Sequence, residues 1–391
     1  MDFDFDKRIE RRGTNSQKWD EMENRYGISA DDGIAMWVAD HDFAVPPAVN
    51  ETLKNIAEHG VHGYFGNDRP YLAAIQHWMA SRHGWVVAPE WILSFHGLVH
   101  GITTAIQAFS EPGEGVILFS PVYHAFYRVI RYNGREVLES PLVERDGRYH
   151  MDLDALGKSL TGNEKMVIIS SPHNPGGRVW SLQELRALAE FCERHDLLLV
   201  SDEIHQDLVY PGQMHTVSAM AAPDHLDRLI VLNAPSKVFN MAGSYNGQAI
   251  IPDPGLRRRM VRLRNANGFG LNRISALMTT AAYAHGAPWV DELVTYLDEN
   301  RRIFEERMNA IPGVKAMRLQ ATYLEWVDFS GTGMSPEEFT RRVEREARVA
   351  ANHGHTFGTG GETFLRFNIG LPRATMRDAL ERIETAFSDL Q

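Results

Sequence analysis

Three short apolar runs in the middle of the chain are each followed closely by polar residues. The runs cover residues 166–169, 197–200 and 229–232. Asn174 follows the first run, Asp202 the second and Lys237 the third. Short apolar runs are typical of the buried strands of an open α/β sheet, in which ligands bind beyond the carboxyl ends of the strands. The pattern therefore predicts a mostly parallel sheet that carries an amide, a carboxylate and an amine to one edge.

An amide, a carboxylate and an amine in that order suit a binding site for pyridoxal 5′-phosphate (PLP). In such a site a lysine forms a Schiff base with the cofactor, an aspartate pairs with its pyridinium nitrogen and an asparagine binds its phenolic oxygen. Taken singly, Lys237 is also consistent with a surface lysine, Asp202 with a helix N-cap and Asn174 with an Asn-Pro turn. The ordered set favours the cofactor site.

The composition argues against several other classes of protein. At 391 residues the chain exceeds the usual size of a single hydrophobic core, so we expect a large domain and a smaller one. The formal net charge of -11 argues against nucleic acid as the main partner, because phosphate binding requires a basic face. No apolar run approaches the roughly 20 residues that span a membrane, so no membrane partner is expected.

A cytoplasmic location is expected from the cysteine content and from the first residues. Cys192 is the only cysteine, which rules out an internal disulfide and suits a reducing compartment. Residues 1–6 (MDFDFD) lack the basic and then apolar pattern of a signal peptide.

The alternation of apolar runs with helix-like segments predicts two domains. Residues 46–286 are expected to form the large PLP-binding domain, with further strands at 116–119 and 247–251. A helix between residues 181 and 195, apolar on one face, completes a βαβ unit with its flanking strands. The smaller α+β domain is expected to consist of residues 1–45 and 287–391, with helices at 289–308, 336–348 and from 375, and strands at 321–329 and 364–369.

Six motifs in order make the chain resemble a known family. They are residues 36–43 (MWVADHDF), 121–124 (PVYH), 172–180 (PHNPGGRVW), 201–205 (SDEIH), 234–240 (APSKVFN) and 360–366 (GGETFLR). Through them the chain resembles the fold type I PLP enzymes of the class I/II aminotransferase group, and within that group the MalY/PatB-type cystathionine (cysteine-S-conjugate) β-lyases. The resemblance covers nearly the whole chain. It implies PLP as cofactor and an α/β fold, with a doubly wound sheet in the large domain and a smaller α+β domain.

The resemblance implies catalytic roles for three residues. Lys237 is expected to hold PLP and to act as the base at the substrate Cα, while Asp202 keeps the pyridine nitrogen protonated. Tyr123 is expected to stack on the ring, with a core tyrosine as the plainer interpretation. His205 stands where related aminotransferases carry a tyrosine that binds the phenolic oxygen, and a buried structural histidine is its alternative.

Phosphate binding is expected from Ser236 and from a helix N-terminus. The backbone amides of Gly97, Leu98 and Val99 are expected to open a helix, and a helix N-terminus attracts anions. In the family a tyrosine of the neighbouring subunit also reaches the phosphate, and Tyr64 matches that position. The resemblance therefore implies a homodimer with shared sites.

Binding of a small amino-acid substrate is expected from Arg366 and from the N-terminal segment. Arg366 lies in an apolar run, where its charge requires either a substrate carboxylate or a buried salt bridge, and we favour the carboxylate. Trp37, Ala39 and Asp40 are expected to contact the substrate as well. Residues 353–361 are rich in glycine, which permits a mobile lid.

Several histidines depart from the family pattern. His41, His62, His96 and His100 lie near the predicted cofactor or substrate segments. They are consistent with a specialised substrate or with a different fate of the substrate carbanion. A metal site is disfavoured, because no carboxylate or cysteine completes a set of ligands around these histidines.

The favoured function is α,β-elimination on a cysteine S-conjugate, which gives a thiol, pyruvate and ammonia. Two other activities use the same residues: amino transfer, and decarboxylation coupled to oxidative deamination of an S-conjugated cysteine. A regulatory binding protein on the same scaffold is a further alternative. The intact set of Lys237, Asp202 and Arg366 disfavours it.

Overall fold

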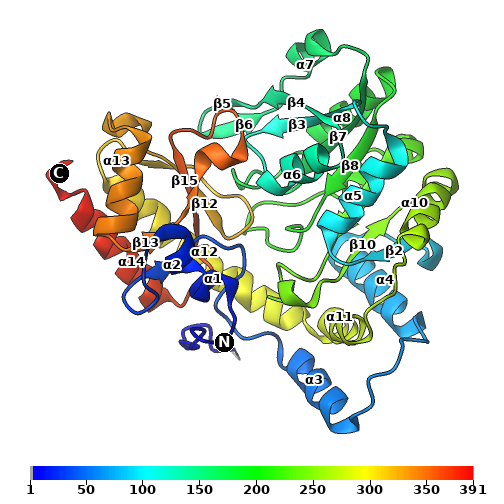
Figure 1. Ribbon diagram of the computed structural model, residues 1–391, viewed down its shortest axis with the longest axis horizontal. Helices are drawn as coiled ribbons and strands as arrows, with labels where there is room; N and C mark the ends of the chain where they lie inside the picture. Colours follow the sequence, from blue (N-terminus) through cyan, green and yellow to red (C-terminus); the bar gives the residue numbers. More distant parts are fainter. Residues whose placement is uncertain (1–2, 391) are drawn as a thin grey trace.

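The computed structural model describes residues 3–390 and is built around a seven-stranded sheet (Figure 1). Its strand order is β2-β10-β9-β8-β7-β3-β4. The strands are β2 (Ile92–Phe95), β3 (Gly115–Ser120), β4 (Glu136–Pro141), β7 (Glu164–Ser170), β8 (Leu198–Asp202), β9 (Leu229–Asn233) and β10 (Gly247–Ile250). All neighbours pair in parallel except β10, which is antiparallel to both β2 and β9. The five strands expected from apolar runs are confirmed, and so is the α/β fold class.

The strands are buried on both faces because successive side chains point to opposite sides of the sheet. In β3, Ile117 and Phe119 join one hydrophobic core, whereas Val116 and Leu118 join the other. Helices α4 (Arg69–His83), α8 (Leu182–Arg194) and α11 (Arg273–His285) contribute to the first core. Helices α5 (Leu98–Phe109), α6 (His124–Tyr132) and α10 (Pro254–Ala266) contribute to the second. The sheet is therefore covered by helices on both faces, as in a doubly wound fold.

Helix α8 confirms the βαβ unit expected from the sequence. Its N-terminus is a capping box, in which the Ser181 side chain accepts from the Glu184 amide and the Glu184 carboxylate accepts from the Ser181 amide. Leu185, Leu188 and Cys192 lie on its buried face. Cys192 is thus a packing residue, and burial raises the pKa of its thiol to about 12.

A second sheet of four antiparallel strands lies C-terminal to the large sheet in the sequence. Its order is β11 (Lys315–Ala316), β12 (Leu324–Asp328), β15 (Phe364–Asn368) and β14 (Asn352–His353). The helices of this part are α12 (Ala287–Ala310), α13 (Pro336–Arg341) and α14 (Arg373–Ala386), and a π-helical turn at Arg342–Glu346 continues α13. The expected order of helices and strands after Pro288 is confirmed.

The N-terminal segment joins this second part of the structure. Strand β1 (Ile34–Ala35) pairs in parallel with β13 (Val349–Ala350). In Figure 1 the blue helices α1 (Gln17–Asp20) and α2 (Met22–Tyr26) lie beside the orange and red C-terminal elements. The division into residues 46–286 against 1–45 with 287–391 stays a prediction.

Shorter elements complete the described part of the chain. Helix α3 (Pro47–His59) packs on α11, and a hairpin of β5 (Val143–Arg145) and β6 (Arg148–His150) follows β4. The short helices α7 (Leu153–Ser159) and α9 (Ser218–Ala221) lie in connections of the large sheet. Among residues 3–390, no helix has the length and apolar character that crossing a membrane requires.

Candidate active site

A cavity of about 1580 Å³ opens where the carboxyl edge of the large sheet meets the N-terminal segment and the second sheet. Every residue predicted for the site except Tyr64 lines this cavity: Trp37, Ala39, Asp40, Gly97, Leu98, Val99, Tyr123, Asn174, Asp202, His205, Ser236, Lys237 and Arg366. The structure thus brings together residues that are spread over most of the chain.

Strand register explains why the three polar groups converge. Ser170 at the end of β7 pairs with Asp202 at the end of β8, and Asp202 pairs in turn with Leu232 of β9. The three parallel strands therefore end at the same level. The segments that follow them carry Asn174 and Lys237 to the same edge, beside Asp202.

Asp202 lies in a setting that opposes its negative charge. The backbone amide of Ile204 donates to its Oδ1 at 3.1 Å. Burial raises the pKa of Asp202 to about 7, against the opposing effects of this hydrogen bond and of Lys237. A cationic group beside this carboxyl favours its ionised form.

The amine of Lys237 points toward the N-terminal segment. Its Nζ donates to the carbonyl oxygen of Ala39 at 2.8 Å. Burial lowers the pKa of Lys237; the positive charge of Arg366 adds to that effect, and Asp40 and Asp202 oppose it. A lowered pKa increases the fraction of the neutral amine, which is the form that acts as nucleophile and base.

Arg366 is 2% exposed and makes no salt bridge to a carboxylate of residues 3–390. Its guanidinium donates to Asn174 Oδ1 at 2.9 Å, to the Trp37 carbonyl at 3.1 Å and to Asn352 Oδ1 at 2.5 Å. It also lies over the ring of Phe357, 4.9 Å from the centroid. Burial lowers its pKa to about 10, so the group stays cationic at neutral pH. The buried salt bridge considered from the sequence is therefore absent among residues 3–390.

Tyr123 and His205 occupy the cavity wall as neutral groups. Burial raises the pKa of Tyr123 and lowers that of His205 to about 3. Tyr123 precedes α6 at its N-cap position, 5.6 Å from Phe126 between ring centroids. The Nδ1 atom of His205 is buried without a hydrogen-bond partner among the described residues.

The helix expected to open at Gly97 is present as α5, and its N-terminus lines the cavity. Gly97 is its N-cap residue with φ of 78° and ψ of 168°. An L-residue rarely adopts that conformation, so glycine is required here to place the first amides of the helix. Ser236 lines the same cavity from the segment after β9.

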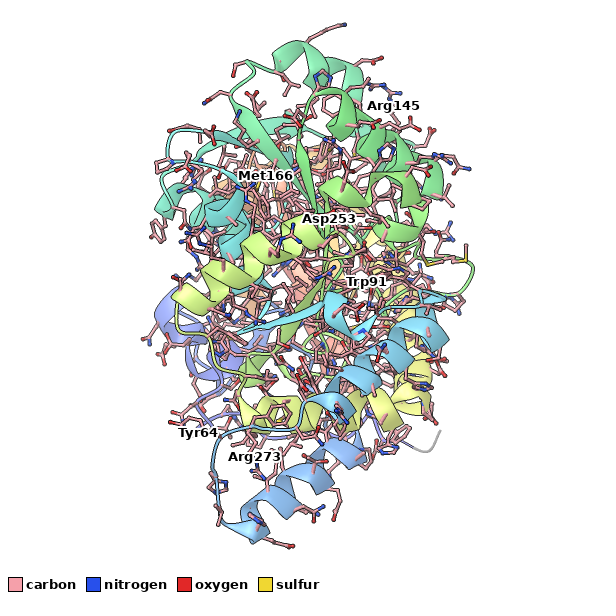
Figure 2. All side chains as sticks on the ribbon, turned by 90° about the vertical axis from the view of Figure 1, so that its right-hand side faces the viewer. Tyr64, Trp91, Arg145, Met166, Asp253 and Arg273 are labelled. Atoms are coloured by element: carbon pink, nitrogen blue, oxygen red, sulfur yellow. The ribbon has the colours of Figure 1, made fainter. Side chains whose placement is uncertain are left out.

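Tyr64 lies apart from this site. It is on the segment that joins α3 to α4 and is fully exposed, with a relative accessibility of 105% (Figure 2). Within a single chain it does not line the cavity.

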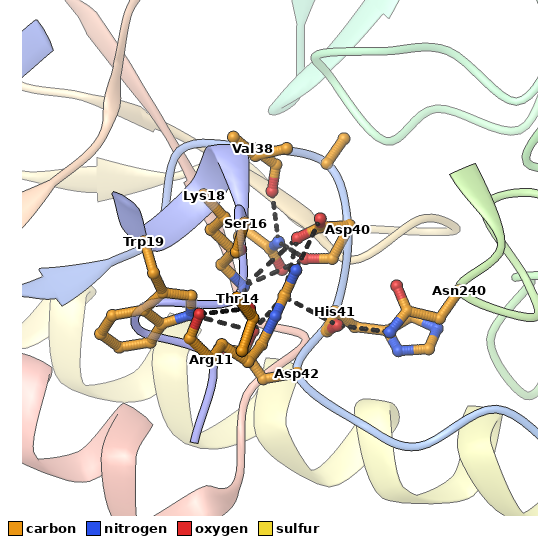
Figure 3. Close-up of polar contacts among 12 residues, drawn as sticks. Arg11, Thr14, Ser16, Lys18, Trp19, Val38, Asp40, His41, Asp42 and Asn240 are labelled. Atoms are coloured by element: carbon orange, nitrogen blue, oxygen red, sulfur yellow. Dashed lines mark hydrogen bonds and ion pairs between the residues drawn. The ribbon is translucent and has the colours of Figure 1, made fainter. Parts of the chain in front are cut away.

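The N-terminal segment contributes residues that the sequence did not identify. Figure 3 shows Arg11 bound to both Asp40 and Asp42, with Lys18 beside them. Tyr26 of α2 and Asn352 of β14 also line the cavity, close to Arg366. No motif marks Arg11 or Lys18, because each acts through contacts with a segment more than twenty residues away in the chain.

The unusual histidines are in different settings. His41 is fully buried, and its Nε2 lies 3.3 Å from the Val238 carbonyl oxygen. His96 and His100 line the cavity, whereas His62 is exposed. The described residues contain no cluster of three side chains suited to a metal ion.

Comparisons with known proteins agree with this geometry. The family model described as aminotransferase class I and II matches residues 34–383. The chain is 42% identical to cystathionine beta-lyase PatB of Bacillus subtilis (strain 168), covering 99% of this chain and 100% of that protein. It is 33% identical to Protein MalY of Escherichia coli (strain K12), with 96% of each covered.

A solved structure is similar over the whole length. Cystalysin from Treponema denticola, which contains a pyridoxal 5′-phosphate cofactor, is 34% identical with a TM-score of 0.95, and all of both chains is covered. Since the family model spans most of the chain and these relatives align from end to end, the chain belongs to the class I and II aminotransferase family.

Proposed function

We propose that the protein is a PLP-dependent carbon–sulfur β-lyase that acts on cysteine S-conjugates. The observation that carries this proposal is the convergence of Lys237, Asp202 and Arg366 on one cavity. These are an amine, a carboxyl and a cation that has no carboxylate partner among the described residues. Relatives named cystathionine beta-lyase support the same class of reaction.

The residues present fit PLP. The buried carboxyl of Asp202, whose pKa burial raises to about 7, would pair with the protonated ring nitrogen. The amide of Asn174 and the Nδ1 atom of His205, which has no hydrogen-bond partner in the described part of the chain, suit the polar ring substituents. The N-terminus of α5 after Gly97, together with Ser236, suits a phosphate. When bound, PLP supplies an electron sink for charge that develops at the substrate Cα.

The protein's own side chains bind the substrate and transfer its proton. Arg366 binds the substrate α-carboxylate through its planar guanidinium and fixes the orientation of the Cα–H bond. Lys237, with its pKa lowered by burial, removes the proton from Cα. Asp202 stays ionised beside a protonated ring nitrogen. The carbon–sulfur bond breaks, and the sulfur leaves Cβ as a thiolate that takes up the proton removed by Lys237. Hydrolysis of the remaining three-carbon unit gives pyruvate and ammonia.

We also infer that the protein forms a homodimer and is cytoplasmic. A homodimer in which Tyr64 reaches the partner's phosphate site accounts for the full exposure of Tyr64 in the single chain. A cytoplasmic location suits a protein whose only cysteine, Cys192, is buried.

Product analysis tests the proposal. The PLP-loaded protein is mixed with an S-substituted L-cysteine under air, and thiol, pyruvate and ammonia are quantified. Equal amounts of the three products are expected. A keto acid that retains the thioether would show amino transfer, and release of carbon dioxide would show decarboxylation. Either result would contradict the lyase assignment.

A further inference from the structure

Four charged side chains form a compact cluster beside the catalytic lysine. Arg11 donates to both carboxylate oxygens of Asp40, at 3.1 and 3.0 Å, and to Asp42 at 2.5 Å. Lys18 Nζ lies 3.2 Å from Asp42 and 4.0 Å from Asp40. Two cations thus face two anions. We call these four residues the N-terminal clamp (Figure 3).

Lys18 is an unusual member of this cluster because its side chain is 0% exposed. Burial lowers its pKa, and Asp42 and Asp40 oppose that effect. Its Nζ also donates to the Asp40 carbonyl oxygen at 3.0 Å, and its own carbonyl accepts from Trp37 Nε1 at 2.8 Å. A buried lysine is costly unless it is paired and hydrogen-bonded, so the clamp depends on both aspartates.

The clamp holds the backbone that binds Lys237. The Ala39 carbonyl accepts from Lys237 Nζ at 2.8 Å and from the Tyr323 hydroxyl at 3.0 Å. Two residues further along, the His41 carbonyl accepts from Asn240 Nδ2 at 2.6 Å. Residues 39–41 therefore connect the clamp directly to the segment that carries Lys237.

We propose that Arg11 and Lys18 are positioning residues for Lys237: they keep the Ala39 carbonyl in place, and their ion pairs offset the negative charge that Asp40 presents to the lysine amine. This inference rests on the proposed PLP function. It assigns a role to Asp40 that differs from direct substrate contact.

The charges around Lys237 and Asp40 agree with this role. Lys237 faces the carboxyls of Asp40 and Asp202 and the guanidinium of Arg366, while the neutral His205 lies on the same wall. The charged groups that face Asp40 are Lys18, Arg11 and Lys237, and Tyr323 and His41 lie close by as neutral rings. Burial alone would raise the pKa of Asp40, but Lys18, Arg11 and Lys237 outweigh it and hold that pKa below its ordinary value.

Removing one cation of the clamp should leave an excess of negative charge beside Lys237. In the Arg11→Met variant, the uncompensated negative charge of Asp40 favours the protonated form of the Lys237 nitrogen. The readout is a pH titration of the visible absorbance of the PLP-loaded protein, which reports the proton on the Lys237 nitrogen. We expect the midpoint to rise by about one pH unit, the lower end of the shift that a close opposite charge produces. Lys18→Met should shift it in the same direction.

A double-mutant cycle shows whether the effect passes through Asp40. Asp40→Asn alone should lower the midpoint and keeps the test usable if Arg11→Met does not fold. In the Asp40→Asn background, Arg11→Met should no longer raise the midpoint. The matched control is Arg12→Met, since Arg12 is the adjacent arginine but pairs with Glu10 outside the clamp.

Two results would overturn the inference. One is a midpoint that stays unchanged in Arg11→Met and in Asp40→Asn, and the other is an equal rise in both backgrounds. A wild-type protein that shows no visible band after incubation with PLP would contradict the PLP site itself. These outcomes distinguish a wrong role for the clamp from a wrong assignment of the PLP site.

Discussion

The guanidinium of Arg366 is buried in β15 and, among residues 3–390, is bound only by uncharged groups. Its Nε atom is buried without a partner in the same part of the chain. A buried charge of this kind requires compensation, which the α-carboxylate of the proposed substrate would supply. The motif around Arg366 predicted this role, but its hydrogen bond to Asn174, 192 residues away, could not be predicted from either motif alone.

Replacing Arg366 should impair substrates that carry an α-carboxylate. Lysine keeps the charge but loses the planar fork, and charge-assisted hydrogen bonds contribute about 1.5–3 kcal/mol. We expect Arg366→Lys to lower kcat/KM for an S-substituted cysteine by about 10²-fold. Binding of the matching S-substituted cysteamine, which has no carboxylate, should stay unchanged. If the affinity for the cysteamine compound fell by the same factor as kcat/KM for the cysteine compound, the assignment would be contradicted.

Glu325 is a second buried charge-bearing residue, and it lies outside the site. It is 0% exposed in β12, and both carboxylate oxygens lack a hydrogen-bond partner among the described residues. Burial raises its pKa well above the ordinary value; Glu305 adds to this effect and Arg301 opposes it. Burial therefore favours the protonated form of Glu325 in the folded protein.

The raised pKa of Glu325 predicts a stability that falls with rising pH. The folded state binds a proton that the unfolded state releases near pH 4.5, so this contribution is fully present below that pH. It is lost as the pH rises toward the folded-state pKa, at up to about 1.4 kcal/mol per pH unit. In urea unfolding at pH 5, 7 and 9, the free energy of unfolding of Glu325→Gln should increase relative to that of the wild type as the pH rises. The exposed Glu337→Gln serves as the control. A constant difference between Glu325→Gln and the wild type would contradict a raised pKa.

At the level of elements, the site depends on how helices and strands end. Strands β7, β8 and β9 were predictable because each is a continuous apolar run. Strand β4 was not, because it is at the edge of the sheet and several of its side chains are half-buried or exposed. The antiparallel direction of β10 was not predictable either, since an apolar run carries no information about direction. The clamp of Arg11 and Lys18 depends on tertiary contacts and left no pattern in the sequence.

The start of helix α5 depends on the backbone conformation of Gly97. An alanine at position 97 must adopt a φ of 78°, a conformation that L-residues avoid at a cost of about 1–3 kcal/mol. No neighbouring atom obstructs a Cβ there, so backbone strain is the only effect. Relaxation of the strain moves the first amides of α5, and we expect Gly97→Ala to raise the Kd for PLP about tenfold.

The matched control for this change is Gly84→Ala. Gly84 has a φ of 69° at the end of α4, away from the cavity. The Gly84→Ala substitution should lower the stability of the protein without changing its affinity for PLP. Fluorescence titration of the cofactor-free protein measures that affinity. Equal PLP affinity in the wild type and Gly97→Ala would show that the start of α5 does not bind the phosphate.

At the level of the whole molecule, the exposed Tyr64 is the residue that a single chain leaves unexplained. The segment between α3 and α4 is exposed over most of its length, including Val61, at 64% exposure. In a symmetric dimer the same segment of each subunit reaches the other. The family resemblance predicted such a contribution, and no single chain can show it.

Mixed dimers test the shared site. Tyr64→Phe should weaken PLP binding by removing a hydroxyl donor to the phosphate, and Lys237→Ala removes the covalent attachment. After the two variants are unfolded together and refolded in equal amounts, about a quarter of the sites should combine an intact Lys237 with an intact Tyr64. Those sites should regain wild-type PLP affinity. No recovery would place Tyr64 outside the partner's site.

We infer that Lys237, at the carboxyl edge of the sheet, is the residue to which PLP attaches. The most direct test is to load the protein with PLP, reduce it with borohydride, digest it and locate the modified lysine by mass spectrometry. We expect modification at Lys237, none at the buried Lys18, and no specific modification in Lys237→Ala. Specific attachment at another lysine, or undiminished specific attachment in Lys237→Ala, would contradict this inference.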